Sequence, residues 1–490
     1  MVAAALPCVA DENTPKTAAL HELYSAHWTR AADAYREILR GEPAWGAGWD
    51  YLVRALIAAL MPGEAYEAAG EALKSAPDTA GAWTAQGRAL FRQGQLAKAE
   101  QAFRKAAALD KNYPYMMEGL ARIYAAVARH KSAEALFVMA WREAPNDPEL
   151  IAAWANTLKG ADHIAALKRV LACYDPSSVE ARRLRSHIAT DETVGERRVR
   201  VLASEYRPYE LNLVRILNGP QSMRGVGLRV RFNDSWEGRL LLDTGSSGIA
   251  LSRKAAARAG FEALEQEGTE VHGIGERTMG SVRQLADEVR IGDLVLRNCP
   301  VSIFETARDA THDGLIGADV FSKFLVQLDW PAMKLRLTPY PGLTAAPEGS
   351  HDAEPLGAGF ERVYLLAHIL IPTFINDGSQ PRLFVIDSGS TANLINVGAA
   401  REATKVHGDS WTIVHGVQGR AKEVSRADRV RLTFGGFRQD NADMIAVDLG
   451  RGSDDGGVDL GGLLGMPVLD QLAMTIDYRN AGVRLEYRKR

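Results

Sequence analysis

The chain has 490 residues, of which 46% are hydrophobic, and this length and composition suit folded cores in about three domains. Its 58 basic and 61 acidic residues leave a net charge of −3, which gives no electrostatic basis for binding nucleic acid. No stretch approaches the ~18 consecutive apolar residues of a membrane-spanning helix. The eleven histidines and three cysteines show no metal-ligand spacing. We therefore expect a globular protein with no membrane span, no cofactor and no metal site.

Residues 1–15 are expected to be a leader or a truncated signal segment. Residues 1–10 are mostly apolar, and Cys8-Val9-Ala10 is similar to a small-residue cleavage site, which slightly favours an exported, periplasmic protein. No lysine or arginine precedes Lys16, so the charged start of a complete signal peptide is missing. A cytoplasmic protein with a frayed terminus therefore stays an open alternative.

Residues 16–178 carry an internal repeat. The clearest unit has small and aromatic residues at the spacing of the 34-residue tetratricopeptide pattern. These residues are Trp83, Gly87, Leu90, Gly94, Ala99, Phe103 and Ala106. The period continues on both sides, since Phe137 lies 34 residues after Phe103 and Trp49 lies 34 residues before Trp83. We expect an all-α solenoid of about four to five helix pairs, with a concave surface suited to a peptide or protein partner.

Residues 179–207 are expected to form a helical linker. The segment is rich in arginine, but acidic residues are interleaved, which favours a solvated helix over a site for an anionic partner. After Pro208 the pattern changes to short alternating segments, such as 227–232, that are typical of strands. Because a stretch rich in proline and glycine at 339–355 divides this part, we expect two mainly β lobes, 208–345 and 346–490.

The two lobes repeat one set of motifs. An apolar run leads into Asp243-Thr244-Gly245 in the first lobe and into Asp387-Ser388-Gly389 in the second. Each run is typical of a buried strand, after which the glycine lets backbone N–H groups turn toward the carboxylate. Three further pairs of segments follow in the same order, all at offsets of 143 to 148 residues: 271–275 and 414–419, 314–317 and 462–465, 324–329 and 472–477. The pattern indicates an internal duplication.

From about residue 206 to residue 490 the chain resembles the aspartic peptidases. In that family each lobe gives one Asp-Thr/Ser-Gly loop above an apolar-apolar-Gly segment, which would be 315–317 and 463–465 here. The compact lobes are similar to the retropepsin branch, whereas two lobes in one chain are similar to the pepsin arrangement. The resemblance also implies flap hairpins at 271–275 and 414–419, although neither carries the tyrosine of a pepsin flap. The expected flap or substrate-binding residues are His272, Gly273, Ile274, His415, Gly416 and Val417.

The resemblance implies that Asp243 and Asp387 are the catalytic residues. Two carboxyls about 3 Å apart cannot both ionise easily, so the pair would share one proton. One aspartate would take a proton from a water while the other hydrogen-bonds the scissile carbonyl. The residues expected to brace the two loops and to support the carboxylates are Thr244, Gly245, Ser388 and Gly389.

The sequence therefore predicts an aspartic endopeptidase that cuts extended peptides, joined to a repeat array that binds a protein partner. The alternative is a binding scaffold that keeps the peptidase fold but does not cleave. The presence of both aspartates, each with its hydroxyl and glycine, favours the enzyme. Pairing of lobes between two chains is a further arrangement that the motifs allow. Substrate preference, working pH and the array's partner are left open.

Overall fold

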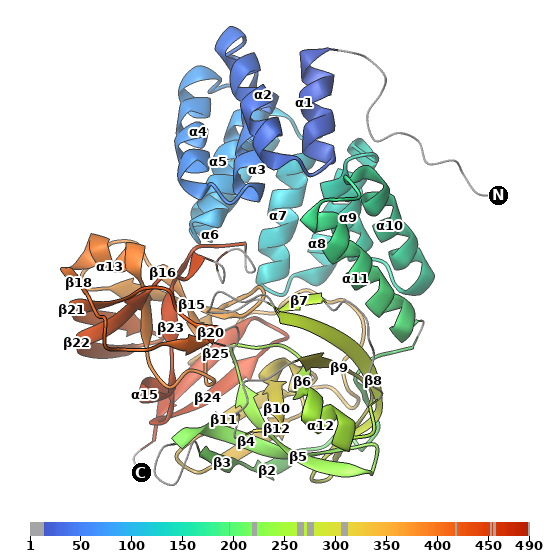
Figure 1. The fold of residues 1–490 in the computed structure, drawn as a ribbon, viewed down its shortest axis with the longest axis vertical. Coiled ribbons are helices and arrows are strands. Elements are labelled where there is room, and N and C mark those ends of the chain that lie inside the picture. The colour runs from blue at the N-terminus through green and yellow to red at the C-terminus, as the bar shows by residue number, and fades with distance from the viewer. Residues whose placement is uncertain are drawn as a thin grey trace. The chain divides into compact units, whose positions relative to one another are not determined.

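The computed structural model describes residues 14–195, 197–217, 223–261, 269–271, 279–304, 312–416, 419–450, 453 and 457–488. These residues divide into two compact units, each described here by itself. The first, 14–125 with 129–195, is all-helical, and the second, 197–488 with 126–128, is mainly β (Figure 1). None of the described helices is both long and apolar enough to cross a membrane.

The helical unit is built from consecutive antiparallel helix pairs. Its described helices are α1 (Pro15–Tyr24), α2 (Trp28–Gly41), α3 (Gly46–Ala58), α4 (Pro62–Ser75), α5 (Ala80–Arg92), α6 (Leu96–Leu109), α7 (Pro114–Ala126), α8 (His130–Glu143), α9 (Pro148–Ala155), α10 (Gly160–Cys173) and α11 (Val179–Val194). The first helices of successive pairs, α3, α5, α7 and α9, begin 34 residues apart, as the sequence period predicts. Small residues allow close packing: a side chain on Gly87 or Gly119 would collide with the ring of Phe103.

Helix α11 covers the arginine-rich segment that the sequence analysis assigned to a linker. Ile188 of α11 is buried in a cluster with Ala166, Leu167 and Val170 of α10. The apolar face of α11 is therefore packed, and the segment is the last helix of the helical unit instead of a solvated connector.

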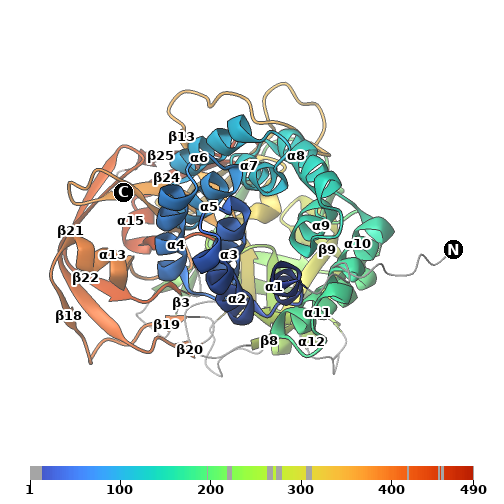
Figure 2. The ribbon, with the colours of Figure 1, turned by 90° about the horizontal axis from the view of Figure 1, so that it is seen from above.

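The helical unit curls until its two ends meet. His27, between α1 and α2, has its Nε2 atom 2.9 Å from a carboxylate oxygen of Asp175, which lies between α10 and α11. Trp28 donates its indole N–H to Glu180, and the amide of Asp175 donates to the carbonyl of Ser25. Seen from above, α3, α5, α7 and α9 lie on the inner side of the curl and α4, α6, α8 and α10 lie outside them (Figure 2).

Buried ion pairs occupy the inner side of this curl. Arg54 of α3 donates hydrogen bonds of 2.7 and 2.8 Å to Asp147, whose carboxylate also caps the N-terminus of α9. Arg88 of α5 pairs with Asp50 at 3.0 Å and with Glu149 at 2.9 Å. Both arginines are only 7% exposed. The pairs thus join α3 and α5 to α9, far along the chain.

The first lobe of the β unit is a closed barrel. Its described elements are β1 (Val201–Leu202), β2 (Tyr209–Asn212), β3 (Val214–Leu217), β4 (Met223–Phe232), β5 (Trp236–Asp243), β6 (Ile249–Ser252), α12 (Arg253–Arg258), β7 (Thr269–Val271), β8 (Met279–Ile291), β9 (Leu294–Phe304), β10 (Gly314–Gly317), the 3₁₀ helix η1 (Ala318–Phe321), β11 (Leu325–Asp329) and β12 (Lys334–Thr338). Strands β9, β6, β10, β5, β4 and β8 pair in that order, and β8 pairs again with β9 to close the barrel.

The second lobe repeats this design. Its described elements are β13 (Glu361–Arg362), β14 (Tyr364–Leu365), β15 (Ile369–Ile375), β16 (Arg382–Ile386), β17 (Leu394–Asn396), α13 (Val397–Ala403), β18 (Val406–Gly408), β19 (His415–Gly416), β20 (Gly419–Arg420), β21 (Val424–Phe434), β22 (Phe437–Val447), β23 (Leu460–Leu464), α15 (Met466–Leu469), β24 (Leu472–Asp477) and β25 (Gly482–Tyr487). Strands β15, β16, β23, β17, β22 and β21 pair in order, and β15 with β21 closes the ring.

A third sheet joins the two lobes within one chain. Among the described residues it has the order β13-β25-β24-β11-β12-β2, so three strands come from each lobe. At its centre β11 and β24 run antiparallel, with Gln327 opposite Thr475. These two residues lie 148 residues apart, which is the offset of the repeated segments around them. Equivalent residues of the two lobes therefore face each other, and the pseudo-two-fold axis passes between them.

Candidate active site

The two Asp-hydroxyl-Gly loops lie at the ends of equivalent buried strands. In the first lobe β5 ends at Asp243 between β4 and the parallel strand β10, with Gly317 opposite Asp243. In the second lobe β16 pairs in parallel with β23, and the amide of Asp387 donates to the carbonyl of Leu464 at 2.9 Å. Because neighbours flank both strands, each aspartate is held at the end of a rigid element.

The apolar-apolar-Gly segments fit beneath the loops because their last residue is glycine. An added Cβ on Gly317 would lie 2.6 Å from the carbonyl oxygen of Ser246, and one on Gly465 would lie 2.3 Å from that of Ala392. Any side chain at these two positions would push the loop away from the strand below it.

The hydroxyls of Thr244 and Ser388 lock the two loops together. Thr244 Oγ1 donates to the carbonyl of Ile386 at 2.7 Å, and Ser388 Oγ donates to that of Leu242 at 2.8 Å. In return, each hydroxyl oxygen accepts the other residue's amide, at 2.9 and 3.1 Å. Thr244 is 3% exposed and Ser388 is fully buried. Four buried hydrogen bonds thus fix the distance between the loops.

Gly245 and Gly389 each support one carboxylate and contact the other. The amide of Gly245 donates to Asp243 Oδ1 at 2.8 Å, and that of Gly389 donates to Asp387 Oδ1 at 2.9 Å. A Cβ on Gly245 would lie 2.7 Å from the carboxyl of Asp387, and one on Gly389 would lie 2.6 Å from the carboxyl of Asp243. Each glycine therefore leaves the space that the opposite carboxyl occupies.

Asp243 and Asp387, here called the dyad, bring two acidic groups together in a largely buried place. Burial raises the pKa of Asp387 well above its usual value, and the charge of Asp243 and the hydrogen bond with it raise the pKa further. The amides of Gly389 and Ser390 oppose this rise only in part. Among the described residues no lysine, arginine or histidine forms an ion pair with either aspartate. Asp387 therefore keeps its proton to a higher pH than an isolated aspartate would.

A further charged pair, which the sequence analysis did not single out, supports the first loop from outside. Asp319 of η1 accepts a hydrogen bond from the amide of Gly248 at 2.8 Å and forms an ion pair with Arg200 at 2.8 Å. In the second lobe Asn393 accepts from the amide of Gly465 at 2.8 Å. Asp319 lies two residues after the repeated segment Gly314–Gly317, and this position was the sequence signal that could have marked it as a residue of the site.

The expected flaps fall largely outside the described residues. His272, Gly273, Ile274 and Val417 all lie outside them. The described strands on either side of the first segment, β7 and β8, pair antiparallel as the arms of a hairpin. In the second lobe His415 and Gly416 form β19, which pairs antiparallel with β20. The role of these flap residues in binding substrate therefore stays a prediction.

Comparison with known proteins gives two family matches. The aspartyl protease family model matches residues 228–320 and 371–468, one segment in each lobe. The tetratricopeptide repeat model matches residues 90–156. The comparison with curated proteins finds no match.

Two solved structures illustrate the likeness of the β unit. An aspartic proteinase from Irpex lacteus is 14% identical with a TM-score of 0.36, and the match covers 58% of this chain and 98% of that one. A retropepsin-like aspartic protease from Rickettsia conorii is 19% identical with a TM-score of 0.22, covering 28% of this chain and 94% of that one. By the family models, the chain thus joins a helical unit that matches the tetratricopeptide repeat to a two-lobed β unit that matches the aspartyl protease family once in each lobe.

Proposed function

We propose that the protein is an aspartic endopeptidase whose catalytic pair is Asp243 and Asp387. The observation that supports this most strongly is the meeting of two carboxyls, one from each lobe, with no ion-pair partner for either in the part of the chain that the structure describes. Such a pair keeps one proton, so it offers an acid and a base at the same place.

The proposed reaction is hydrolysis through a water held between the two aspartates. The ionised carboxylate takes a proton from this water as its oxygen attacks the scissile carbonyl carbon. The protonated carboxyl donates its proton to the carbonyl oxygen, which gives a neutral tetrahedral gem-diol. Collapse of this intermediate breaks the C–N bond, with a proton passed to the leaving amine, and the dyad again holds one proton. Because the pair titrates as a unit, either aspartate can begin as the acid.

Thr244 and Ser388 make four buried hydrogen bonds, two with each other and two with the carbonyls of Ile386 and Leu242, and these bonds support catalysis over a purely binding role. A scaffold that only holds peptides has no need for two carboxyls in contact, which cost free energy through burial and mutual repulsion. The competing function is nonetheless a peptide-binding protein that retains the fold. The cleavage experiment below separates the two.

For the repeat array we propose a protein partner, in keeping with the tetratricopeptide family. Its inner side is occupied by the buried pairs of Arg54 and Arg88 with Asp147 and Asp50. A peptide on that side would have to displace these pairs and leave buried charges without partners. We therefore place the partner on the outer helices instead of in the concave surface that the sequence favoured.

The test is cleavage of a mixed peptide library by the full chain from acidic to neutral pH. Asp243→Asn and Asp387→Asn should each lower the rate by at least ~10²-fold, because each removes the shared proton chemistry. Asp377→Asn is the matched control, since this aspartate of the second lobe has a side chain that is 93% exposed. A statine-type inhibitor should block the wild type.

Two outcomes would count against the proposal. Equal cleavage by wild type and both dyad variants would assign the activity to another site or to a contaminant. If well-folded wild type cleaved no peptide at any pH, the alternative of a peptide-binding scaffold would be favoured. Binding of library peptides without cleavage would then support that alternative.

A further inference from the structure

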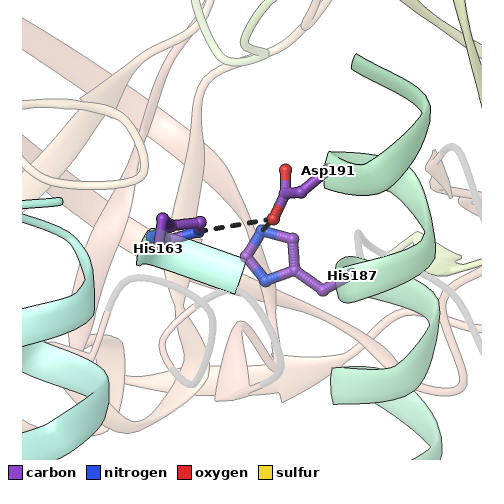
Figure 3. A group of neighbouring side chains, drawn as sticks. All are labelled: His163, His187 and Asp191. Atoms are coloured by element: carbon purple, nitrogen blue, oxygen red, sulfur yellow. Dashed lines mark ion pairs between the residues drawn. The ribbon is translucent and has the colours of Figure 1, made fainter. Parts of the chain in front are cut away.

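Three potential metal ligands meet on the last two helices of the array. His163 comes from α10, and His187 and Asp191 lie one turn apart on α11, all pointing toward one spot (Figure 3). The Nε2 atoms of His163 and His187 lie 3.4 and 3.3 Å from Asp191 Oδ2. All three ligand atoms lie within 4.8 Å of one another.

These distances suit a shared ion better than direct contacts between the side chains. Charge-assisted hydrogen bonds between N–H and a carboxylate are about 2.7–2.9 Å long. By contrast, a tetrahedral zinc site with bonds of about 2.0–2.1 Å has ligand atoms about 3.3–3.4 Å apart. Asp191 Oδ2 is buried and has no hydrogen-bond partner among the described residues. A cation between the three side chains would satisfy this oxygen.

The hydrogen bonding of His163 prepares it as a ligand. Its Nδ1 atom lies 2.7 Å from the carbonyl oxygen of Ala155, at the end of α9, so Nδ1 carries the proton and donates it. In the neutral imidazole Nε2 then carries the lone pair, and this atom lies 3.4 Å from Asp191 Oδ2. Metal-bound histidines are commonly oriented by such a second hydrogen bond to a backbone carbonyl.

The surroundings leave room for an ion to enter. The side chains of His163 and Asp191 are 17% and 24% exposed, and that of His187 is 49% exposed. Three protein ligands leave at least one coordination position for water. Two imidazoles and one carboxylate are a borderline donor set, which favours zinc over magnesium or calcium.

We propose that His163, His187 and Asp191 bind a divalent zinc ion that ties α11 to α10. The sequence analysis expected no metal, because histidine spacing along the chain does not reveal neighbours on different helices. The ion would fix the last helix of the array, whose first turn also contacts the first helices through Glu180 and Trp28.

A second group of similar composition serves as an internal control. His407, Asp428 and Asp443 lie in the second lobe, also with ligand atoms within 4.8 Å of one another. Here Arg426 lies 3.4 Å from a carboxylate oxygen of Asp443, so a guanidinium already neutralises one ligand and would repel a cation. We expect no tight zinc binding at this group.

The test uses the full-length protein, stripped of metal with a chelator and desalted. Zinc is titrated in competition with a fluorescent zinc indicator. Wild type and His407→Ala should each bind one tight equivalent, whereas His187→Ala and Asp191→Asn should lose it. Zinc should also raise the melting temperature of wild type but not of His187→Ala. Alanine favours helix, so His187→Ala should fold like wild type without metal, which far-UV circular dichroism checks.

The proposal fails if wild type binds no zinc more tightly than the indicator. It also fails if the tight equivalent persists in both His187→Ala and Asp191→Asn, or if His407→Ala removes it. Peptide cleavage by the dyad is a separate readout, so loss of zinc binding and loss of activity remain distinguishable.

Discussion

Both units of this protein bury carboxylates, but they treat the charge in opposite ways. In the helical unit Glu149 lies between Arg54 and Arg88; burial acts to raise its pKa, yet the two arginines outweigh this and lower the pKa to about 2. In the β unit the pKa of Asp387 is raised by burial and by its acidic neighbour Asp243. The first arrangement stabilises the fold, whereas the second is the one for which we propose a role in proton transfer.

The contrast shows why burial alone does not identify a functional carboxylate. Asp50 is also buried, and its pKa is raised by that burial despite Arg88. The dyad differs in the group that faces the carboxylate. Asp50 has a guanidinium at 3.0 Å, whereas Asp387 faces the carboxyl of Asp243, which packs against Gly389. Charge that costs stability and has no structural compensation points to function.

The largest expected effect comes from breaking the buried ion pairs of the helical unit, in which arginines neutralise the carboxylates. Arg54→Met should lower the free energy of unfolding by about 3–5 kcal/mol, because it leaves the buried carboxylate of Asp147 without its cationic partner. Arg104→Met is the matched control: this exposed arginine pairs with Glu100 on the same helix, and its loss should cost at most about 0.5 kcal/mol. Urea unfolding followed at a helical signal measures both. Equal, small effects would contradict a structural role for the network.

An intermediate effect is expected from the bonds that join the two loops. Ser388→Ala removes the acceptor of the Thr244 amide and the donor to Leu242, leaving buried groups unpaired at a cost of about 1–3 kcal/mol. It should also lower kcat by loosening the dyad. Ser246→Ala is the control, since that hydroxyl donates to the carbonyl of Asp243 in its own loop, at 3.3 Å, and has no bond to the other lobe among the described residues. If both variants behaved alike, the cross-lobe bonds would not set the geometry.

The smallest expected effect is a pH trend in stability. Folding raises the pKa of Asp387, so the folded state binds a proton that the unfolded state has released above about pH 3.9. Wild type should therefore lose stability relative to Asp387→Asn as pH rises, by at most about 1.4 kcal/mol per pH unit.

The array should show the opposite trend. Wild type should gain stability relative to Glu149→Gln as pH rises from about 2 to about 4.5, because the folded pKa of Glu149 is lowered. Denaturant unfolding of the two variants and of wild type at several pH values checks both signs. If the stability difference from wild type changed with pH in the same direction for both variants, the two units would not treat buried carboxylates in opposite ways.

The sequence predicted most of the backbone arrangement because both units are repetitive. The 34-residue period predicted the succession of helix pairs that begin with α3, α5, α7 and α9, and the segments repeated at offsets of 143 to 148 residues predicted two equivalent lobes. The resemblance to the aspartic peptidases implied that Asp243 and Asp387 meet, because each begins a similar Asp-hydroxyl-Gly motif. Periodicity is a property of the chain itself, so a single sequence reveals it.

Contacts between segments that are not repeats of each other could not be predicted from the sequence. Arg54 reaches Asp147 only because the array curls by an amount that small rotations between repeats determine. The meeting of His163 with His187 depends likewise on the register of α10 against α11. The packing of α11 was missed for a related reason, since its few apolar residues, such as Ile188, are outnumbered by charged ones.

The most direct test of the central claim is the pH dependence of kcat/KM for one cleaved peptide, measured for wild type and Asp387→Asn. If the dyad shares one proton, wild type should show a bell-shaped profile that falls at high pH as this proton is lost, and Asp387→Asn should be inactive throughout. A profile without an alkaline limb, or cleavage that survives in Asp387→Asn, would contradict the account.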